Sequence, residues 1–208
     1  MLRTRIVTAL VMLAVLLPAL FYPSPWPFCA VALLLIAAGV WEWGRLNTLG
    51  HGSSLALAAA GLALCGAAWS MGWLESPSLA LWVVVGAAWV LIGAWLVRRG
   101  VPGWAKVPVA VRVVVGLLAL CLAWLAVAQA RVVGINFLLS ALTLVWMADV
   151  GAYAAGRTFG RRKLAPAISP GKSWEGVYGG MLGVLVLGLG WIWAEGGVGT
   201  SLFSRVWA

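Results

Sequence analysis

The sequence is short of charged side chains, above all acidic ones. Only 9% of its 208 residues are charged, with five Asp or Glu against 14 Lys or Arg. A soluble globular domain usually has about 25% charged and about 45–50% apolar residues, whereas 64% of this chain is hydrophobic. This composition excludes a soluble domain and also a disordered chain. We expect no nucleic-acid partner, because no soluble domain is present to carry the net charge of +9 as a basic face.

Histidine and cysteine are also scarce. The single histidine, His51, has no second His or Cys near it, which excludes a zinc site of the usual kind. Each of the three cysteines lies inside an apolar run and none forms a CxxC pair, so we interpret them as small buried hydrophobic residues. Metal binding or acid–base chemistry must therefore draw on the five acidic residues, which are Glu42, Glu75, Asp149, Glu175 and Glu195.

Long hydrophobic runs predict an all-α, polytopic membrane protein with about seven transmembrane helices. A bilayer core requires roughly 17–25 apolar residues per helix. Runs of about this length lie near residues 6–22, 26–41, 55–74, 79–97, 109–130, 132–148 and 177–194. We interpret the first run as an uncleaved span, because no convincing cleavage site for a signal peptide follows it. No hydrophilic segment is long enough for a separate domain, so a single integral-membrane domain over residues 1–208 is expected.

The distribution of Lys and Arg predicts the orientation of these spans. With the N-terminus in the cytoplasm, all but two of the 14 basic residues fall on the cytoplasmic side, and the two exceptions are Arg131 and Arg205. Basic residues are concentrated in cytoplasmic loops of membrane proteins. We therefore expect a multi-pass protein of the inner (plasma) membrane, with its N-terminus and its active face in the cytoplasm.

One hydrophilic stretch stands out, a predicted cytoplasmic loop over residues 149–176. It begins with Asp149, which is followed by five basic residues that can pair with phosphate oxygens: Arg157, Arg161, Arg162, Lys163 and Lys172. A carboxylate of this kind suits Mg²⁺, which often takes one or two carboxylates together with substrate phosphates. A basic cytoplasmic loop is equally expected from topology and from anionic lipids, so charge alone does not establish a catalytic site.

Several residues of the loop also have a purely structural interpretation. Asp149 can be a carboxylate at a helix end that reaches towards water. Ser169 and Pro170 have the pattern of an N-cap followed by proline at the first helical position, and Glu175 would support the same helix start. The seventh run carries small residues at a spacing that predicts close helix packing: Gly176, Gly180 and Gly183.

The order of the motifs is more specific than any of its parts. Residues 149–153 read Asp-x-Gly-Ala-Tyr, residues 156–160 read Gly-Arg-x-x-Gly, and Lys-Leu follows at 163–164. Residues 169–176 read Ser-Pro-x-Lys-Ser-Trp-Glu-Gly, and Gly-Gly follows at 179–180. This combination resembles the phosphatidate cytidylyltransferase (CDP-diacylglycerol synthase) family. The N-terminal segment 2–6 and the Trp-Glu-Trp sequence at 41–43 are similar as well, so the resemblance covers essentially the whole chain.

The resemblance implies a reaction of phospholipid biosynthesis, in which CTP and phosphatidic acid give CDP-diacylglycerol and pyrophosphate with Mg²⁺ or a similar divalent cation. It implies catalytic roles for Asp149, Lys172 and Glu175, with Asp149 also at the metal. It places Arg157, Lys163, Ser169 and Ser173 at the substrate phosphates. Ser169 and Ser173 would donate hydrogen bonds or shape a helix start, and Glu175 would orient a base or cap the helix. Membrane lipids and a second copy of the chain, in a homodimer, are the further expected partners.

Two departures from the family pattern affect this interpretation. Gly171 stands where family members usually have Lys, which removes one phosphate-facing cation. The acidic C-terminal signature segment of the family does not appear before Ala208. We therefore expect a truncated or frameshifted product, a fragment, or half of a split enzyme, whose activity as a 208-residue chain is in question.

Two other functions remain open from the sequence. A CTP-dependent polyprenol or other lipid-alcohol kinase is one, since some such kinases look similar around this loop. A transporter or a non-catalytic membrane scaffold is the other. The spans contain few polar residues apart from Gln129, Asn136 and scattered Ser or Thr, which disfavours a transport path.

Overall fold

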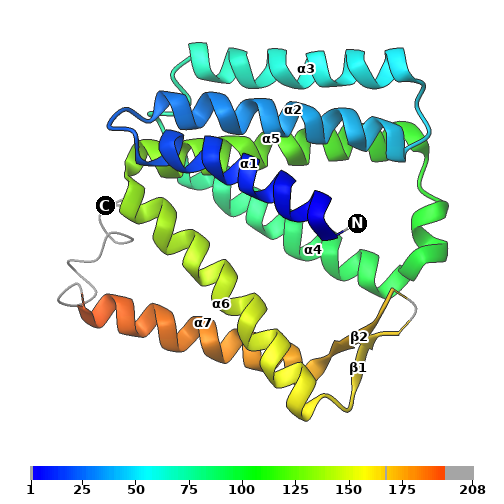
Figure 1. The fold of residues 1–208 in the computed structure, drawn as a ribbon. Coiled ribbons are helices and arrows are strands. Elements are labelled where there is room, and N and C mark those ends of the chain that lie inside the picture. The colour runs from blue at the N-terminus through cyan, green and yellow to red at the C-terminus, as the bar shows by residue number, and fades with distance from the viewer. Residues whose placement is uncertain (1, 167, 195–208) are drawn as a thin grey trace. The chain divides into compact units, whose positions relative to one another are not determined.

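The computed structural model describes residues 2–166 and 168–194, and the described chain is mainly helical, as predicted (Figure 1). Its helices are α1 (Leu2–Phe21), α2 (Trp26–Leu46), α3 (His51–Ser70), α4 (Leu79–Ala105), α5 (Val109–Val133), α6 (Ile135–Phe159) and α7 (Trp174–Ala194). Two short strands, β1 (Lys163–Ala165) and β2 (Ser169–Ser173), form an antiparallel hairpin between α6 and α7.

The helices are long and apolar enough to confirm a polytopic membrane protein. Within the described residues, the six helices α2 to α7 each have the length and hydropathy of a membrane span, and α1 contributes a shorter apolar segment, Ile6–Phe21. Helices suit a bilayer because they satisfy every backbone hydrogen bond within the segment. The exposed apolar side chains along these helices, such as Val90 and Leu91 at about 70% exposure, then face a hydrocarbon environment.

Each of two compact units forms its own helix packing. The first comprises Met1–Pro77 and Pro108–Leu138, where α2 contacts α1, α3 and α5, and α3 also contacts α5 (Figure 1). Its centre contains the fully buried Cys29, Val40 and Ala128. Cys29 and Cys65 are buried and Cys121 is half-buried, so the cysteines are packing residues here, as predicted.

Arg131 forms hydrogen bonds with the backbone at the end of α1, which the sequence did not predict. Its side chain is 7% exposed and lies near the end of α5. Its Nε donates to the carbonyl of Leu20 at 3.1 Å and its Nη2 donates to the carbonyl of Tyr22 at 2.6 Å. The last carbonyls of a helix have no partner within the helix. Arg131 therefore supplies donors to the C-terminal end of α1, where the sequence had suggested only a charge outside the membrane.

The second unit comprises Ser78–Val107 and the chain from residue 139 onward. Helix α4 bends at Gly100, whose φ of 63° lies in the left-handed region that glycine adopts without strain. Helices α6 and α7 run antiparallel and are joined by the β1–β2 hairpin (Figure 1). All the motifs singled out between residues 149 and 180 therefore belong to one unit.

Several helices differ in their bounds from the apolar runs predicted as spans. The sixth span was expected to end at residue 148, but α6 continues to Phe159, so the first part of the predicted loop is helical. Likewise α4 continues past residue 97, α2 continues past residue 41, and α3 covers 51–70 instead of 55–74. The physical reason is that hydropathy detects where the apolar environment ends, whereas a helix ends only where the backbone turns.

Candidate functional site

The site begins with an unusually close approach of two helices. A Cβ atom added at Gly180 of α7 would lie 2.8 Å from the carbonyl oxygen of Ala148 in α6. One added at Gly176 would lie 2.9 Å from the carbonyl oxygen of Ala152. Both distances are shorter than a real Cβ contact, so glycine at these positions allows the two backbones to touch. The packing role predicted for these glycines is confirmed, and it brings Asp149 beside α7.

Three polar side chains follow one side of α6 at intervals of four residues. They are Asp149, Tyr153 and Arg157, all exposed. Arg157 Nη1 donates to the Tyr153 hydroxyl at 2.6 Å, and its guanidinium lies 5.8 Å from the centre of the Tyr153 ring. Eight residues of helix separate Asp149 from Arg157 by roughly 12 Å along the axis. The C-terminal part of α6 therefore presents a carboxylate and a guanidinium about two helical turns apart.

The hairpin carries the predicted lysines. Lys163 of β1 is paired with Ser173 of β2, and Lys163 and Lys172 are both exposed. Ser169 is half-buried at the start of β2. The alternative interpretation of Ser169 and Pro170 as the start of a helix is wrong, because both lie in β2. Proline is tolerated in such an edge strand, where its missing N–H costs no ladder hydrogen bond.

Ser173 starts the helix instead. Its hydroxyl accepts a hydrogen bond from the N–H of Gly176 at 3.2 Å, which is the N-cap arrangement for α7. The residue is only 5% exposed. Ser173 therefore shapes the helix start, which is one of the two roles that the resemblance implied for it.

Glu175 joins the segment after α6 to the first turn of α7. Its carboxylate accepts hydrogen bonds from the backbone N–H of Arg161 at 3.1 Å and of Arg162 at 3.2 Å. It also forms a salt bridge with Arg162 Nε at 3.2 Å. This contact raises the pKa of the Arg162 guanidinium above its usual range, so Arg162 stays charged. The sequence grouped Arg162 with the bases that can pair with phosphate oxygens and did not predict its contact with Glu175, because a partner 13 positions away leaves no local pattern in the sequence.

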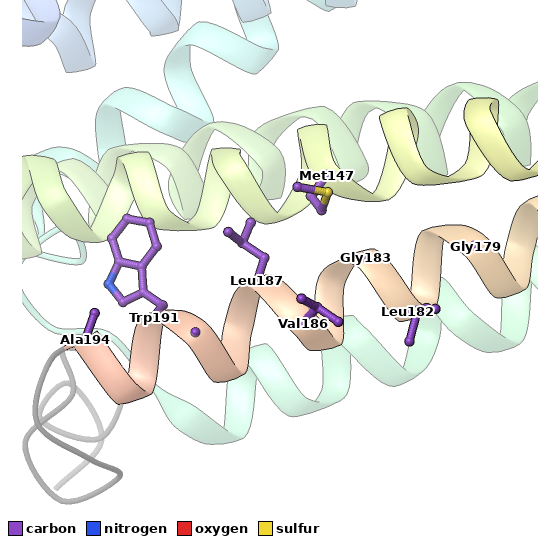
Figure 2. A pocket seen from close by; sticks show the side chains of 9 residues that line it. Met147, Gly179, Leu182, Gly183, Val186, Leu187, Trp191 and Ala194 are labelled. Atoms are coloured by element: carbon purple, nitrogen blue, oxygen red, sulfur yellow. The ribbon is translucent and has the colours of Figure 1, made fainter.

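Apolar grooves flank the α6–α7 pair. One, of about 490 Å³, contains Asp149 in an otherwise apolar wall that consists of Ala148, Ala152, Val177, Gly180, Met181, Val184 and Leu185. Another, of about 770 Å³, is lined by Met147 of α6 and by α7 residues that include Leu187 and Trp191 (Figure 2). Surfaces of this kind can accommodate hydrocarbon chains but have little capacity to bind a polar ligand.

The residues present fit only a sparsely ligated metal. Within residues 2–166 and 168–194, no group of three or more His, Cys, Asp or Glu could hold an ion by itself. The Glu175 carboxylate is already engaged by Arg161 and Arg162. Asp149 offers one hard oxygen donor group, which matches Mg²⁺ when substrate phosphates and water provide the remaining ligands.

Comparison with known proteins identifies the family of the chain. The model of a family described as the cytidylyltransferase family matches residues 3–204. The chain belongs to that family. The phosphatidate cytidylyltransferase of Pseudomonas aeruginosa is 36% identical to this family member over 192 residues, which cover 87% of this chain and 67% of the relative. The phosphatidate cytidylyltransferase of Haemophilus influenzae is 32% identical over 207 residues, which cover 90% of this chain and 71% of the relative.

Shorter matches cover about a quarter of the chain. The phosphatidate cytidylyltransferase of Staphylococcus epidermidis is 46% identical over 54 residues, which are 26% of this chain and 21% of the relative. No solved structure matches this family member significantly. The resemblance found in the motifs is therefore confirmed at the level of the family. The expectation about the C-terminal signature stays a prediction, and residues 195–208 lie outside the described residues.

Proposed function

We propose that this protein transfers the cytidylyl group of CTP to phosphatidic acid, giving CDP-diacylglycerol and pyrophosphate. A match to the cytidylyltransferase family along nearly the whole chain carries the proposal, together with relatives named phosphatidate cytidylyltransferase. A phosphate oxygen of phosphatidic acid bonds to the α-phosphorus of CTP. The bond from that phosphorus to the oxygen bridging to the β-phosphate breaks, and pyrophosphate leaves with the bond electrons.

The exposed bases provide the charge that this reaction needs. Arg157 at the end of α6 and Lys163 and Lys172 on the hairpin bind the phosphates of CTP in our proposal. Charge-assisted hydrogen bonds of this kind are strong, and Arg can bind a phosphate through two parallel contacts. Lys172 neutralises the charge that develops on the leaving pyrophosphate. Ser169, half-buried at the start of β2, donates a hydrogen bond to the same phosphates.

Asp149 holds Mg²⁺ in the proposed site. When bound, the ion neutralises phosphate charge and orients the reacting groups. Asp149 contributes one carboxylate group as a ligand. Its position on α6 therefore determines where along the helix the metal binds. Among the described residues that line its groove, Asp149 is the one charged residue in otherwise apolar walls, which supports a reaction at a lipid substrate.

The lipid substrate stays in the membrane during the reaction. An acyl chain of phosphatidic acid lies against the apolar α6–α7 surface, and CTP enters from the cytoplasm, where the basic residues concentrate. We propose accordingly that the active face is the cytoplasmic face of the inner (plasma) membrane. A homodimer stays a prediction, to be tested by measuring the mass of the protein in detergent micelles.

The proposal is tested with purified protein in mixed micelles that contain dioleoyl phosphatidic acid, CTP and Mg²⁺. We expect CDP-diacylglycerol and pyrophosphate in equal amounts, no phosphorylation of an added polyprenol, and no product after chelation of Mg²⁺. Asp149→Asn should lower the rate at least about 100-fold, the scale of losing a principal electrostatic group. Glu75→Gln, a change at an exposed carboxylate between α3 and α4 that lies outside the motifs, is the matched control and should keep the wild-type rate.

Two results would contradict the proposal. Formation of a prenyl phosphate from the polyprenol would make the protein a lipid-alcohol kinase. Absence of any CTP turnover by correctly folded wild-type protein would favour the scaffold alternative.

A further inference from the structure

We infer that Glu175 is a positioning residue, which fastens the basic hairpin to α7 by accepting hydrogen bonds from the backbone of Arg161 and Arg162. Arg162 is the second part of this clamp and does not serve as a phosphate ligand. The consequence for activity rests on the proposed function. The clamp itself is a property of the folded chain and can be tested without any substrate.

The geometry around the carboxylate carries the inference. Oε2 of Glu175 accepts from the N–H of Arg161 at 3.1 Å and from the N–H of Arg162 at 3.2 Å. Oε1 accepts from Nε of Arg162 at 3.2 Å. A carboxylate has about four acceptor positions, so both of its oxygens are occupied by donors of the protein itself. A metal ion or a substrate hydroxyl would have to compete with these donors for Glu175.

Arg162 is fixed to α7 by contacts besides the one with Glu175. Its guanidinium lies 5.9 Å from the centre of the Tyr178 ring, about one helical turn beyond Glu175. Its carbonyl oxygen accepts a hydrogen bond from the N–H of Trp174 at 2.9 Å. Side chain and main chain of Arg162 are therefore both bound to the first turns of α7. Although Arg162 belongs to the basic stretch of the sequence, its guanidinium is directed to this helix.

The clamp acts on the lysines that follow. Lys163 comes directly after Arg162 and is paired with Ser173, the N-cap of α7. Lys172 precedes Ser173 on the opposite strand. Fixing Arg162 on α7 therefore sets where both lysines stand relative to Arg157 at the end of α6. Misplacing phosphate-binding groups by about 1 Å can cost a large part of the rate, even when every charge is kept.

The two partners of the clamp are not equivalent. The Glu175 carboxylate accepts from the backbone N–H groups of Arg161 and Arg162 as well as from the Arg162 side chain, whereas the side chain of Arg162 supplies only the Nε donor, and its backbone N–H stays in place when that side chain is replaced. Glutamine at 175 keeps one carbonyl oxygen that can accept from the backbone, and alanine keeps none. We therefore expect Glu175→Ala to loosen the hairpin most, with Glu175→Gln and Arg162→Lys in between.

The first test is limited proteolysis of the full chain in detergent micelles, with trypsin and mass spectrometry. Cleavage after Lys163 and Lys172 reports opening of the hairpin in every variant. Glu175→Ala should raise this cleavage rate roughly three- to tenfold, the range expected when contacts of one exposed charged group are lost. Glu42→Ala makes the same substitution at an exposed carboxylate of α2 and should leave the rate unchanged. Equal rates in Glu175→Ala and wild type would overturn the inference.

The second test separates positioning from direct catalysis. Glu175→Gln should retain most of the CDP-diacylglycerol activity and Glu175→Ala should lose clearly more, with the same Mg²⁺ concentration for half-maximal rate in both. If the two variants lose activity equally and their Mg²⁺ requirement changes, Glu175 is a metal or substrate ligand and the inference is wrong. If Glu175→Ala does not fold, the comparison of Glu175→Gln with Arg162→Lys decides in the same way.

A charge exchange gives a further distinction. In the double variant Arg162→Glu with Glu175→Arg, the ion pair is restored but the backbone N–H groups lose their acceptor. We expect no rescue of hairpin protection, and complete rescue would contradict the dominant backbone role. If wild-type protein makes no CDP-diacylglycerol, the proposed function fails while the proteolysis results still decide whether the clamp exists.

Discussion

At the scale of single residues, arginines of the same charge have different partners. Arg157 is exposed and contacts only Tyr153 of its own helix among the contacts described above, whereas Arg162 is bound to α7 and Arg131 is buried beside the end of α1. All three count equally in the net charge. Sequence could predict that the bases concentrate near the motifs, because residue type and spacing are visible there. It could not assign these partners, because each depends on how distant segments pack.

Replacing Arg131 by alanine should destabilise the protein. The carbonyl of Leu20 would lose its donor in a buried place and that of Tyr22 would lose its donor in a partly buried one, and hydrogen bonds from a charged group to such acceptors contribute about 2 kcal/mol in total. The measurement is thermal unfolding in detergent, compared with Arg98→Ala, which removes an exposed charge from α4. An unfolding temperature that drops no further in Arg131→Ala than in Arg98→Ala would show that these hydrogen bonds are not stabilising.

At the scale of elements, helices were predictable and their ends were not. Seven apolar runs predicted helices in the places where α1 to α7 lie, because hydropathy reports burial in lipid directly. The extension of α6 through Gly156 to Phe159 and the hairpin that follows were missed. Polar, glycine-containing segments such as 149–176 are compatible with loop, helix or strand. Which of these secondary structures forms depends on contacts with α7. The spacing of Gly176 and Gly180 did predict close packing, since small residues at such intervals form one face.

A methyl group at Gly180 should force α6 and α7 apart. Its Cβ would lie 2.8 Å from the carbonyl oxygen of Ala148, and overpacking of this kind costs about 1–3 kcal/mol. Gly190→Ala is the matched control on the same helix, because nothing lies within 4 Å of the Cβ position there. Alanine in an unhindered helical position is favoured over glycine, so the control should unfold at the wild-type temperature or above it.

Thermal unfolding and CDP-diacylglycerol formation of the two variants check this expectation. Gly180→Ala should lower both the unfolding temperature and the rate, since Asp149 follows Ala148 directly and would move with it. Equal stability and rate in Gly180→Ala and Gly190→Ala would contradict the close contact of these helices.

At the scale of the whole molecule, the shortage of acidic residues limits the carboxylates that can bind a metal. The second unit brings Asp149 and Glu175 to the α6–α7 region, and Glu175 is occupied by the hairpin. Asp149 is then the carboxylate of the described site that is left for a metal. Fold class and family could be predicted from sequence, because hydropathy and motif order are properties of the chain itself. The division of tasks between the two acids follows only from the folded arrangement.

The central claim is that the α-phosphorus of CTP is the point of attack. It is tested most directly by following the label from CTP that carries ³²P in either the α- or the γ-phosphate, in micelles with phosphatidic acid and Mg²⁺. The account predicts that the α-label appears in the lipid product and that the γ-label appears only in pyrophosphate. Label from the γ-phosphate in the lipid, with CDP as the other product, would show phosphoryl transfer by a kinase and contradict the account.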